Sequence, residues 1–273
     1  MHTLQPSKPC PRFLVAGATF SPGNIVVECP ALVAGPGRAR TPVCLACLAT
    51  VSPTNMTGFN ASFQGGSGGL VGCSKGGWPV CCAECEKEFE KTKECSLLSS
   101  AGLACTIKDF SLATEELDFL TPLRLILAME ASKEVKEKVS KLKVDVEQTK
   151  KRNKQVYGES SDTKVIEVIA KKLKVVTDAA AVEAAVAVVE SYSMVVDASK
   201  GTVGVYPDLA SITHSCSPNT YHTIWSSMHL VVRAAAPLHP GEPVAICRVD
   251  TSRCNLFRRR LLKEALVECQ CSR

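Results

Sequence analysis

The chain has 273 residues, of which 45% are hydrophobic and 22% charged, and its formal net charge is +5. This composition is ordinary for a soluble globular protein, and the length allows one large domain or two small ones. There is no run of about 18 apolar residues, which excludes a transmembrane helix. The N-terminus has no basic segment followed by an apolar stretch, so we expect no signal peptide and a reducing cytoplasmic or nuclear environment.

The positive charge comes from one segment of the chain. Residues 133–154 hold nine Lys/Arg and four Asp/Glu, which accounts for the whole excess. A single basic segment is usually the solvated face of a helix, so the sequence does not favour a nucleic-acid partner.

The first predicted elements are extended. Residues 12–34 read as strand, with the β-branched residues 25–28 following a turn signal at Ser21, Pro22 and Gly23. A cysteine-rich region comes next and is interrupted by a flexible Gly/Ser-rich loop at residues 65–69.

The middle of the chain is predicted to be helical. A helix is expected to begin near Thr121, with Pro122 at its first position. The basic segment carries apolar residues at helical spacing and predicts one amphipathic helix, through Val135, Val139, Leu142 and Val146. Residues 150–162 are polar and predicted to be a loop, and residues 163–196 predict a second helical stretch.

Strands return after Gly201. Residues 229–234 and 244–249 are short and β-rich, and a turn at Pro240 and Gly241 separates them. Strands therefore open and close a chain whose middle is helical. This order predicts an α+β protein built on one discontinuous β-fold with insertions.

Fifteen cysteines could indicate disulfides or metal sites. In a reducing compartment disulfides are rare, and short paired spacings favour zinc. Two such pairs, Cys44-x2-Cys47 and Cys81-x3-Cys85, predict one tetrahedral four-thiolate zinc site with a structural role. The alternative is a set of scattered, buried cysteines.

The stretch from Ile212 to Asn219 is the most informative in the chain. It contains Thr213-His214-Ser215-Cys216 and is followed by a strand containing Gly241-Glu242, then by Cys269-x-Cys271. With the opening residues 10–40, this ordered set resembles a SET domain interrupted by a MYND zinc finger. The cysteine pattern up to residue 81 is similar to the insect-type branch of that family.

The resemblance implies a domain order for residues 10–273. It comprises an N-terminal SET segment, a MYND finger, a helical insert, the core SET segment and a partial post-SET segment, at residues 10–40, 41–96, 97–200, 201–260 and 261–273. In a MYND finger the first zinc would use the four cysteines of the two pairs. The second would use Cys73 and Cys95, but Gly76 and Lys91 occupy its other ligand positions, and neither side chain has a lone pair to offer. We therefore expect no second MYND zinc, and we do not expect Cys82 to repair the site.

Members of this family are protein-lysine methyltransferases that use S-adenosylmethionine. The resemblance assigns cofactor contacts to His214, to Thr213 in place of an asparagine, and to Val267 in place of an aromatic residue. Pro11 stands at an expected glycine, and Arg248 stands at the catalytic tyrosine. Because an arginine stays charged and would repel the sulfonium, we predict weak or absent activity and doubtful cofactor binding.

The resemblance also implies a post-SET zinc. Cys216, Cys269 and Cys271 would be three of its ligands, with the fourth just beyond Cys271. The chain ends at Arg273, so either the site is incomplete or the sequence is truncated.

Two functions follow from these observations. The first is that of a weak or inactive methyltransferase-type protein that takes lysine-containing protein substrates. The second is that of a non-catalytic zinc-binding scaffold or transcriptional adaptor, which recruits protein partners such as proline-containing peptides. A zinc adaptor with an unrelated C-terminal domain is the third and least favoured.

Overall fold

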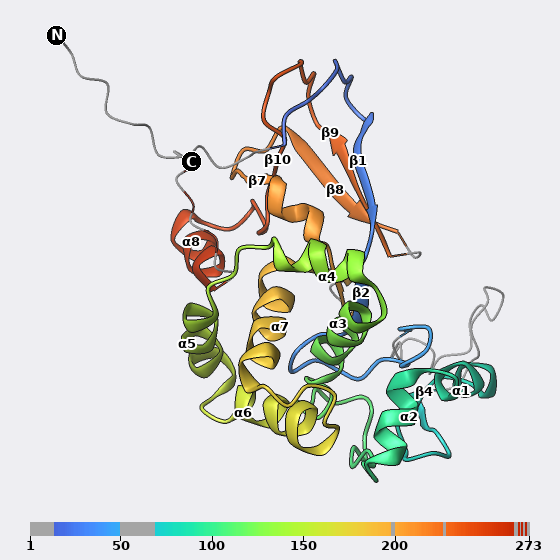
Figure 1. Ribbon diagram of the computed structural model, residues 1–273. Coiled ribbons are helices and arrows are strands. Elements are labelled where there is room, and N and C mark those ends of the chain that lie inside the picture. Colours follow the sequence, from blue (N-terminus) through green and yellow to red (C-terminus); the bar gives the residue numbers. More distant parts are fainter. Residues whose placement is uncertain are drawn as a thin grey trace. The chain divides into compact units, whose positions relative to one another are not determined.

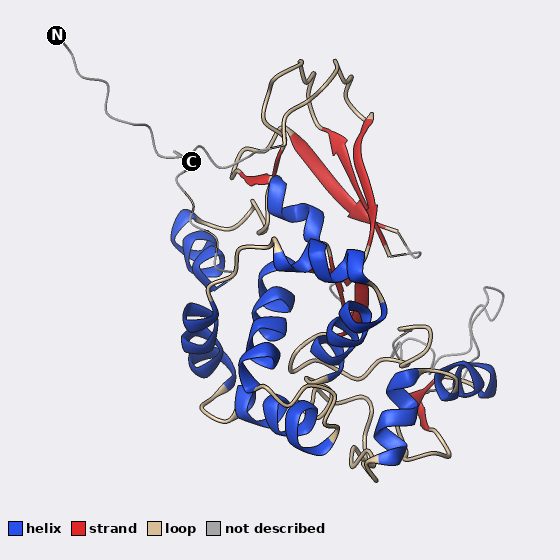
Figure 2. Ribbon diagram, in the orientation of Figure 1, coloured by secondary structure: helices blue, strands red, loops and turns tan. Residues whose placement is uncertain are grey.

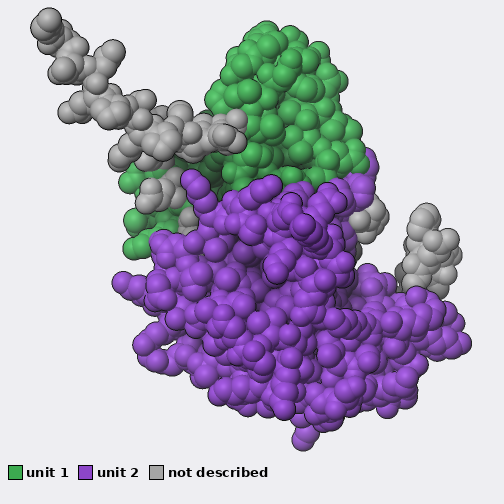
Figure 3. Space-filling model, viewed as in Figure 1, with its two compact units in different colours: residues 1–29, 208–223, 230–273 green, residues 30–207, 224–229 purple. Residues whose placement is uncertain are grey.

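The computed structural model describes residues 14–49, 69–197, 200–225 and 228–264, and beyond them Val267, Cys269 and Cys271. The chain forms two compact units, each assembled from separated stretches (Figure 3). Unit 1 comprises residues 1–29, 208–223 and 230–273, and unit 2 comprises residues 30–207 and 224–229. Within the described ranges, every helix is too short or too polar to traverse a bilayer.

The sheet of unit 1 carries the C-terminal strands. Its strand order is β1–β9–β8, in which β1 is Ile25–Pro30, β9 is His229–Ala234 and β8 is Thr220–Ile224 (Figure 1). The central strand β9 buries Leu230, Val231 and Val232 completely. A second, parallel pair joins β7 (Thr213–His214) to β10 (Ala245–Ile246). The 3-10 helix Pro207–Ser211 precedes β7, and helix α8 (Asn255–Glu264) follows β10.

Unit 2 contains most of the helices, which are blue in Figure 2. In chain order they are α1 Ala83–Glu90, α2 Lys93–Ser100, α3 Leu120–Ala131, α4 Lys133–Ser140, α5 Val146–Tyr157, α6 Ser161–Ile166, the π-helix Glu167–Lys172 and α7 Ala179–Tyr192. At the N-terminus of five of these helices, the side chain of a capping residue accepts a backbone N–H. The capping residues are Cys82, Thr92, Ser132, Asp145 and Asp178. These caps satisfy N–H groups that lack a partner within the helix, which fixes where each helix begins.

Two small sheets complete unit 2. Strand β2 (Val33–Pro36) pairs antiparallel with β6 (Lys200–Val205), which pairs in turn with β5 (Ser193–Asp197). Helix α3 packs on β2 and on α7. This close approach needs a glycine at position 35, because an added Cβ there would collide with Thr121 Oγ1. Strands β3 (Val71–Gly72) and β4 (Pro79–Val80) form a separate hairpin beside α1.

The α+β class is confirmed, and so are several predicted elements. The predicted strand at residues 229–234 is β9, residues 25–28 lie in β1, and α3 begins one residue before Thr121. Of the strand predicted over residues 244–249, only Ala245 and Ile246 pair. The division of the chain into five segments stays a prediction.

Three helical predictions were wrong. The basic segment forms two helices rather than one, because α4 ends at Ser140 and Asp145 caps a new helix. Residues 150–157 belong to that helix, α5, and are not a loop. Their polarity misled the prediction because Asn153 is fully buried and donates to Asp162 inside unit 2.

The predicted helical stretch 163–196 also divides. It contains the end of α6, the π-helix, a break before Asp178 and helix α7, and it ends as strand β5. In β5 the backbone of Ser193 and Met194 pairs with β6 instead of continuing α7. In the basic segment Lys150 pairs with Glu147 and Glu183, and Lys154 pairs with Glu159. These partly exposed ion pairs fit a solvated helix face.

A buried charge cluster holds distant parts of unit 2 together. The Arg38 side chain is 8% exposed, and its guanidinium lies 3.5 Å from Asp118, 2.5 Å from Asp162 and 3.4 Å from Glu190. The Tyr157 ring lies 4.7 Å from the guanidinium carbon. The cluster joins residues that are up to 152 positions apart in sequence.

Asp118 gives this cluster a pH dependence. Burial raises the pKa of Asp118 to about 7, although the Ala39 N–H and the Arg38 charge act to lower it. The raised pKa means that the native state binds more protons than the unfolded chain between about pH 4 and pH 7. The stability that Asp118 contributes is therefore full below about pH 4 and is lost as pH rises through about 7.

We expect Asp118→Asn to remove this dependence, because the amide keeps an oxygen for the Ala39 N–H but does not titrate. The free energy of unfolding of the unaltered protein, relative to that of Asp118→Asn, should fall between about pH 5 and pH 8. Urea unfolding of both proteins across this range measures the difference. A difference that stays constant or rises with pH would contradict the assignment.

Candidate metal centres and active site

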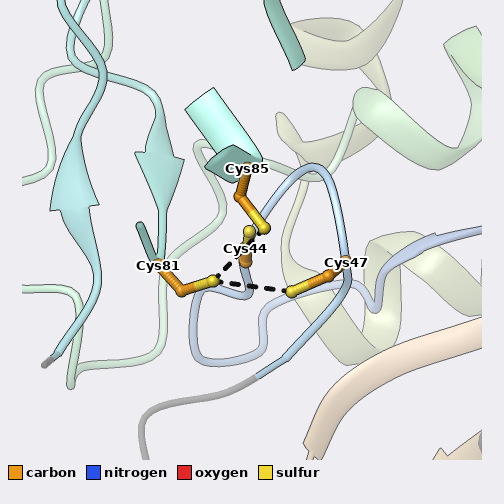
Figure 4. Close-up of side chains that lie close together, drawn as sticks. All are labelled: Cys44, Cys47, Cys81 and Cys85. Carbon is orange, nitrogen blue, oxygen red and sulfur yellow. Dashed lines mark hydrogen bonds between the residues drawn. The ribbon is translucent and has the colours of Figure 1, made fainter. Parts of the chain in front are cut away.

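Four cysteine sulfurs gather in unit 2, where the sequence predicts a zinc site (Figure 4). Cys44 and Cys47 come from the segment after residue 40, Cys81 follows strand β4, and Cys85 lies on α1. The Cys81 sulfur lies 3.6 Å from that of Cys47 and 3.4 Å from that of Cys85, and all four sulfurs lie within 4.8 Å of one another. A tetrahedral zinc with Zn–S bonds of about 2.3 Å places its sulfurs about 3.8 Å apart, so this cluster fits the ion.

The surroundings of Cys44 favour a thiolate. Its side chain is fully buried, which opposes ionisation, yet the backbone N–H groups of Cys47, Ala46 and Cys81 hold the pKa of this thiol below its usual value. Burial raises the pKa of Cys85 to about 12. A bound cation would offset this cost, because metal binding replaces the thiol protons.

The neighbouring Cys82 has a different role. Its sulfur accepts the N–H of Cys85 at 3.5 Å and so caps helix α1. The cap fixes the start of α1 and thereby places Cys85 opposite Cys81.

Cys73 and Cys95 are both buried and lie near enough for the charge of one to affect the other. Among the described residues, no third cysteine, histidine or carboxylate joins them in a cluster suited to a metal. Gly76 has a φ of +108°, and Lys91 pairs with Glu88 at 2.6 Å. The backbone at Gly76 thus disfavours any side chain there, and the Lys91 ammonium is directed to a carboxylate.

A second ligand cluster lies in unit 1. It contains the predicted ligands Cys216, Cys269 and Cys271, and with them His214, for which the family resemblance implies a cofactor contact instead. The Cys216 sulfur lies 3.5 Å from His214 Nε2 and 3.6 Å from the Cys269 sulfur. The His-x-Cys spacing was the sequence signal that could have placed His214 in this cluster, because residues two apart in an extended segment share a face.

Arg248 lies next to this cluster, directly after β10 and Cys247. Its backbone N–H points at His214 Nδ1 at 3.4 Å, and its guanidinium donates to the Leu209 carbonyl at 2.9 Å. Burial first, and then the Arg248 charge, lower the pKa of both His214 and His222. A permanent positive charge therefore lies beside two imidazoles and disfavours their protonation.

The other predicted cofactor residues are placed as follows. The Thr213 hydroxyl donates to the Val244 carbonyl at 3.0 Å, across the β7–β10 pair. Val267 is half-buried just after α8, and its N–H donates to Leu262. Pro11 lies outside the described residues.

Asn219 anchors the segment after Cys216 through its side chain. Its side-chain amide donates to the Pro243 carbonyl at 2.8 Å and accepts the Ala245 N–H at 3.0 Å. This pair of bonds holds the His214–Asn219 turn against β10.

Comparison with known proteins identifies the family to which this chain belongs. The SET domain family matches residues 79–247, which is more than half of the chain and ends one residue before Arg248. A 72-residue segment is 35% identical to histone-lysine N-methyltransferase SMYD3 of Mus musculus and of Homo sapiens, covering 26% of this chain and 17% of those proteins. Histone-lysine N-methyltransferase ASHR1 of Arabidopsis thaliana is also 35% identical over 72 residues, which is 15% of its length.

The aligned segment thus spans less than a fifth of these curated relatives. The family match is broader, and it includes the helices of unit 2, strands β8 and β9 and the turn that carries His214 and Cys216. The chain belongs to the SET domain family, and its relatives are SET proteins of the SMYD type.

Proposed function

We propose that this protein is a SET-family scaffold that binds protein partners and has little or no methyltransferase activity. The observation that carries the proposal is Arg248, whose guanidinium is bonded to the Leu209 carbonyl beside His214 and His222. The family places a tyrosine at this position to orient the substrate amine.

Methyl transfer from a sulfonium to lysine needs a neutral amine aligned with the donor. The hydroxyl of a tyrosine can orient that amine, whereas a guanidinium has no lone pair to accept from it. Its fixed charge also repels the sulfonium and any protonated lysine. Loss of one preorganised polar group commonly lowers a rate about 100-fold to 1,000-fold, and Arg248 adds repulsion to that loss.

The residues assigned to S-adenosylmethionine do not fit it well. The Thr213 hydroxyl is used in a strand pair, and both ring nitrogens of His214 already have neighbours within 3.5 Å. The charge next to them is positive, as is that of the cofactor's sulfonium.

The partner is proposed to be a protein. The relatives are named as histone-lysine methyltransferases, so a lysine-containing chain such as a histone tail, in the nucleus or the cytoplasm, is the expected class. A proline-containing peptide is the second class, which rests on the resemblance of residues 41–96 to a MYND finger.

A methyl-transfer assay tests the proposal. Purified protein and Arg248→Tyr are incubated with core histones and S-adenosylmethionine labelled in the methyl group. We expect no label above the protein-free control from either, because Thr213 and His214 remain unsuited to the cofactor after Arg248 is replaced. Labelling by the unaltered protein would show a working methyltransferase. Labelling by Arg248→Tyr alone would contradict the part of the proposal that concerns the cofactor.

A further inference from the structure

We infer that Arg124 is a positioning residue for the four-cysteine cluster, which consists of Cys44, Cys47, Cys81 and Cys85. Through Arg124, zinc binding and the attachment of the ligand turn (residues 44–48) and of α2 to α3 strengthen each other. The inference rests on the zinc ion predicted for this cluster. It does not rest on the proposed function, because a structural ion is held whether or not methyl groups are transferred.

The Arg124 side chain reaches three separate segments of unit 2. It lies on helix α3 and is 17% exposed. Its Nε and Nη2 atoms donate to the two carboxylate oxygens of Glu94 on α2, at 2.6 Å and 3.0 Å. Its Nη1 atom donates to the Ala34 carbonyl of β2, and Nη2 also donates to the Leu45 carbonyl, each at 2.8 Å. One guanidinium therefore joins α3 to residues that are 30, 79 and 90 positions away in sequence.

Leu45 connects this guanidinium to the zinc ligands. It is buried and directly follows the ligand Cys44. Its N–H donates to the carbonyl of Pro79 in β4 at 2.9 Å, and Pro79 lies two residues before the ligand Cys81. The peptide groups on both sides of Leu45 are thus fixed, one by β4 and the other by Arg124. These bonds set the position of the first ligand pair relative to the second.

The other end of the ligand turn is held as well. Leu48 follows the ligand Cys47, has a φ of +62°, and donates its N–H to the Cys44 carbonyl at 2.9 Å. Its own carbonyl accepts the hydroxyl of Thr202, a buried residue of β6, at 3.1 Å. The turn is therefore attached to unit 2 through two carbonyls, one bonded to Arg124 and the other to Thr202. Outer bonds of this kind orient metal ligands.

Glu94 indicates whether Arg124 acts through its charge or through its bonds. The Glu94 side chain is 5% exposed, and both of its oxygens accept from Arg124. The two charges therefore offset each other. Zinc with four thiolates is a net anion, and a neutral ion pair compensates little of that charge. The effect of Arg124 on the metal comes from position, through the Leu45 carbonyl.

This arrangement couples the metal to the packing of α2. Without Arg124, the Leu45 carbonyl and the buried Glu94 carboxylate lose a hydrogen-bond donor, which is costly for buried polar groups. The ligand turn and α2 also lose their common attachment to α3. Because coupling between two equilibria is reciprocal, a residue that strengthens zinc binding must contribute more to folding stability when zinc is bound.

The test is the zinc affinity of the full chain in competition with a chelator. The ion that Cys44→Ser loses identifies the four-cysteine cluster. In Arg124→Met this ion should bind about 10–100-fold more weakly, which is the usual effect of losing an outer-shell group. In Arg124→Lys the charge remains, but a single ammonium cannot keep the fork to Glu94 and both carbonyl bonds. The affinity should therefore fall in this variant too, and an unchanged affinity would overturn the inference.

Arg38→Met is the matched control. Arg38 is also a buried arginine of unit 2 with acidic partners, but its partners Asp118, Asp162 and Glu190 lie outside α2 and the ligand turn. The control should keep the zinc affinity of the unaltered protein although it is less stable. If Arg124→Met binds zinc as tightly as Arg38→Met, Arg124 does not position the cluster.

Urea unfolding with zinc and after chelation provides a second measurement. The loss of stability caused by Arg124→Met should be larger with zinc than without it. An equal loss in both conditions would show a purely structural role and overturn the inference. If Arg124→Met folds poorly, Arg124→Lys takes its place in both measurements. A chain that holds no zinc at the cluster would also overturn the inference, whereas the methyl-transfer assay would be unaffected.

Discussion

Replacing Cys44 by serine is expected to release one zinc ion per chain and to unfold the region around α1 and α2. Cys44 is fully buried and shares the ion with Cys47, Cys81 and Cys85. In small zinc-binding peptides the metal contributes about 10–16 kcal/mol, which acts as folding energy. Hydrogen exchange should therefore accelerate in residues 71–100, and metal analysis should show one ion fewer.

Cys29→Ser is the matched control for this experiment. Cys29 is also buried, at 7% exposure, but it lies outside both ligand clusters. The variant should keep its full zinc content, since burial of a hydroxyl is the only change. If Cys44→Ser keeps the same zinc content as Cys29→Ser, the four-cysteine cluster is not a zinc site.

The second large effect is expected from Arg38→Met. Methionine retains an apolar side chain but removes the charge that faces Asp118, Asp162 and Glu190. Removing one partner from a buried ion cluster leaves uncompensated charges and typically costs about 3–5 kcal/mol. Urea unfolding should show a loss of this size in the free energy of unfolding.

An exposed pair provides the comparison. Lys91 and Glu88 are 68% and 66% exposed and lie 2.6 Å apart, and exposed pairs contribute about 0–1 kcal/mol. Lys91→Ala should therefore change stability little. If Arg38→Met costs no more than Lys91→Ala, the buried cluster does not hold unit 2 together.

The features that the sequence predicts well are those with a local pattern. The Cys44–Cys47 and Cys81–Cys85 spacings led to four sulfurs that do lie together, and the β-branched run at residues 229–234 is strand β9. The predicted loop at residues 150–162 was wrong over residues 150–157, which belong to α5. Polar residues usually indicate an exposed segment, whereas Asn153 is buried and donates to Asp162. Strand β5 was missed because its valines continue the composition of α7, and only pairing with β6 separates the two.

Long-range relations left no signal in the sequence. Arg38 and its partners at positions 118, 162 and 190 are widely separated, so no spacing rule connects them. The family resemblance assigned His214 to the cofactor. Its place beside Cys269 and Cys271 depends on the tertiary fold, which no local spacing predicts. The substitution of tyrosine by Arg248 was visible in the sequence, but its bond to the Leu209 carbonyl required the fold.

We propose that this SET-family chain keeps a cysteine framework suited to zinc while its cofactor site has changed. Calorimetric titration of S-adenosylmethionine into the full chain, in buffer that contains zinc, tests it most directly. We predict no measurable heat of binding up to millimolar cofactor, because Arg248 places a fixed positive charge beside Thr213 and His214. Saturable binding with a micromolar Kd would contradict the claim and make the protein a candidate methyltransferase.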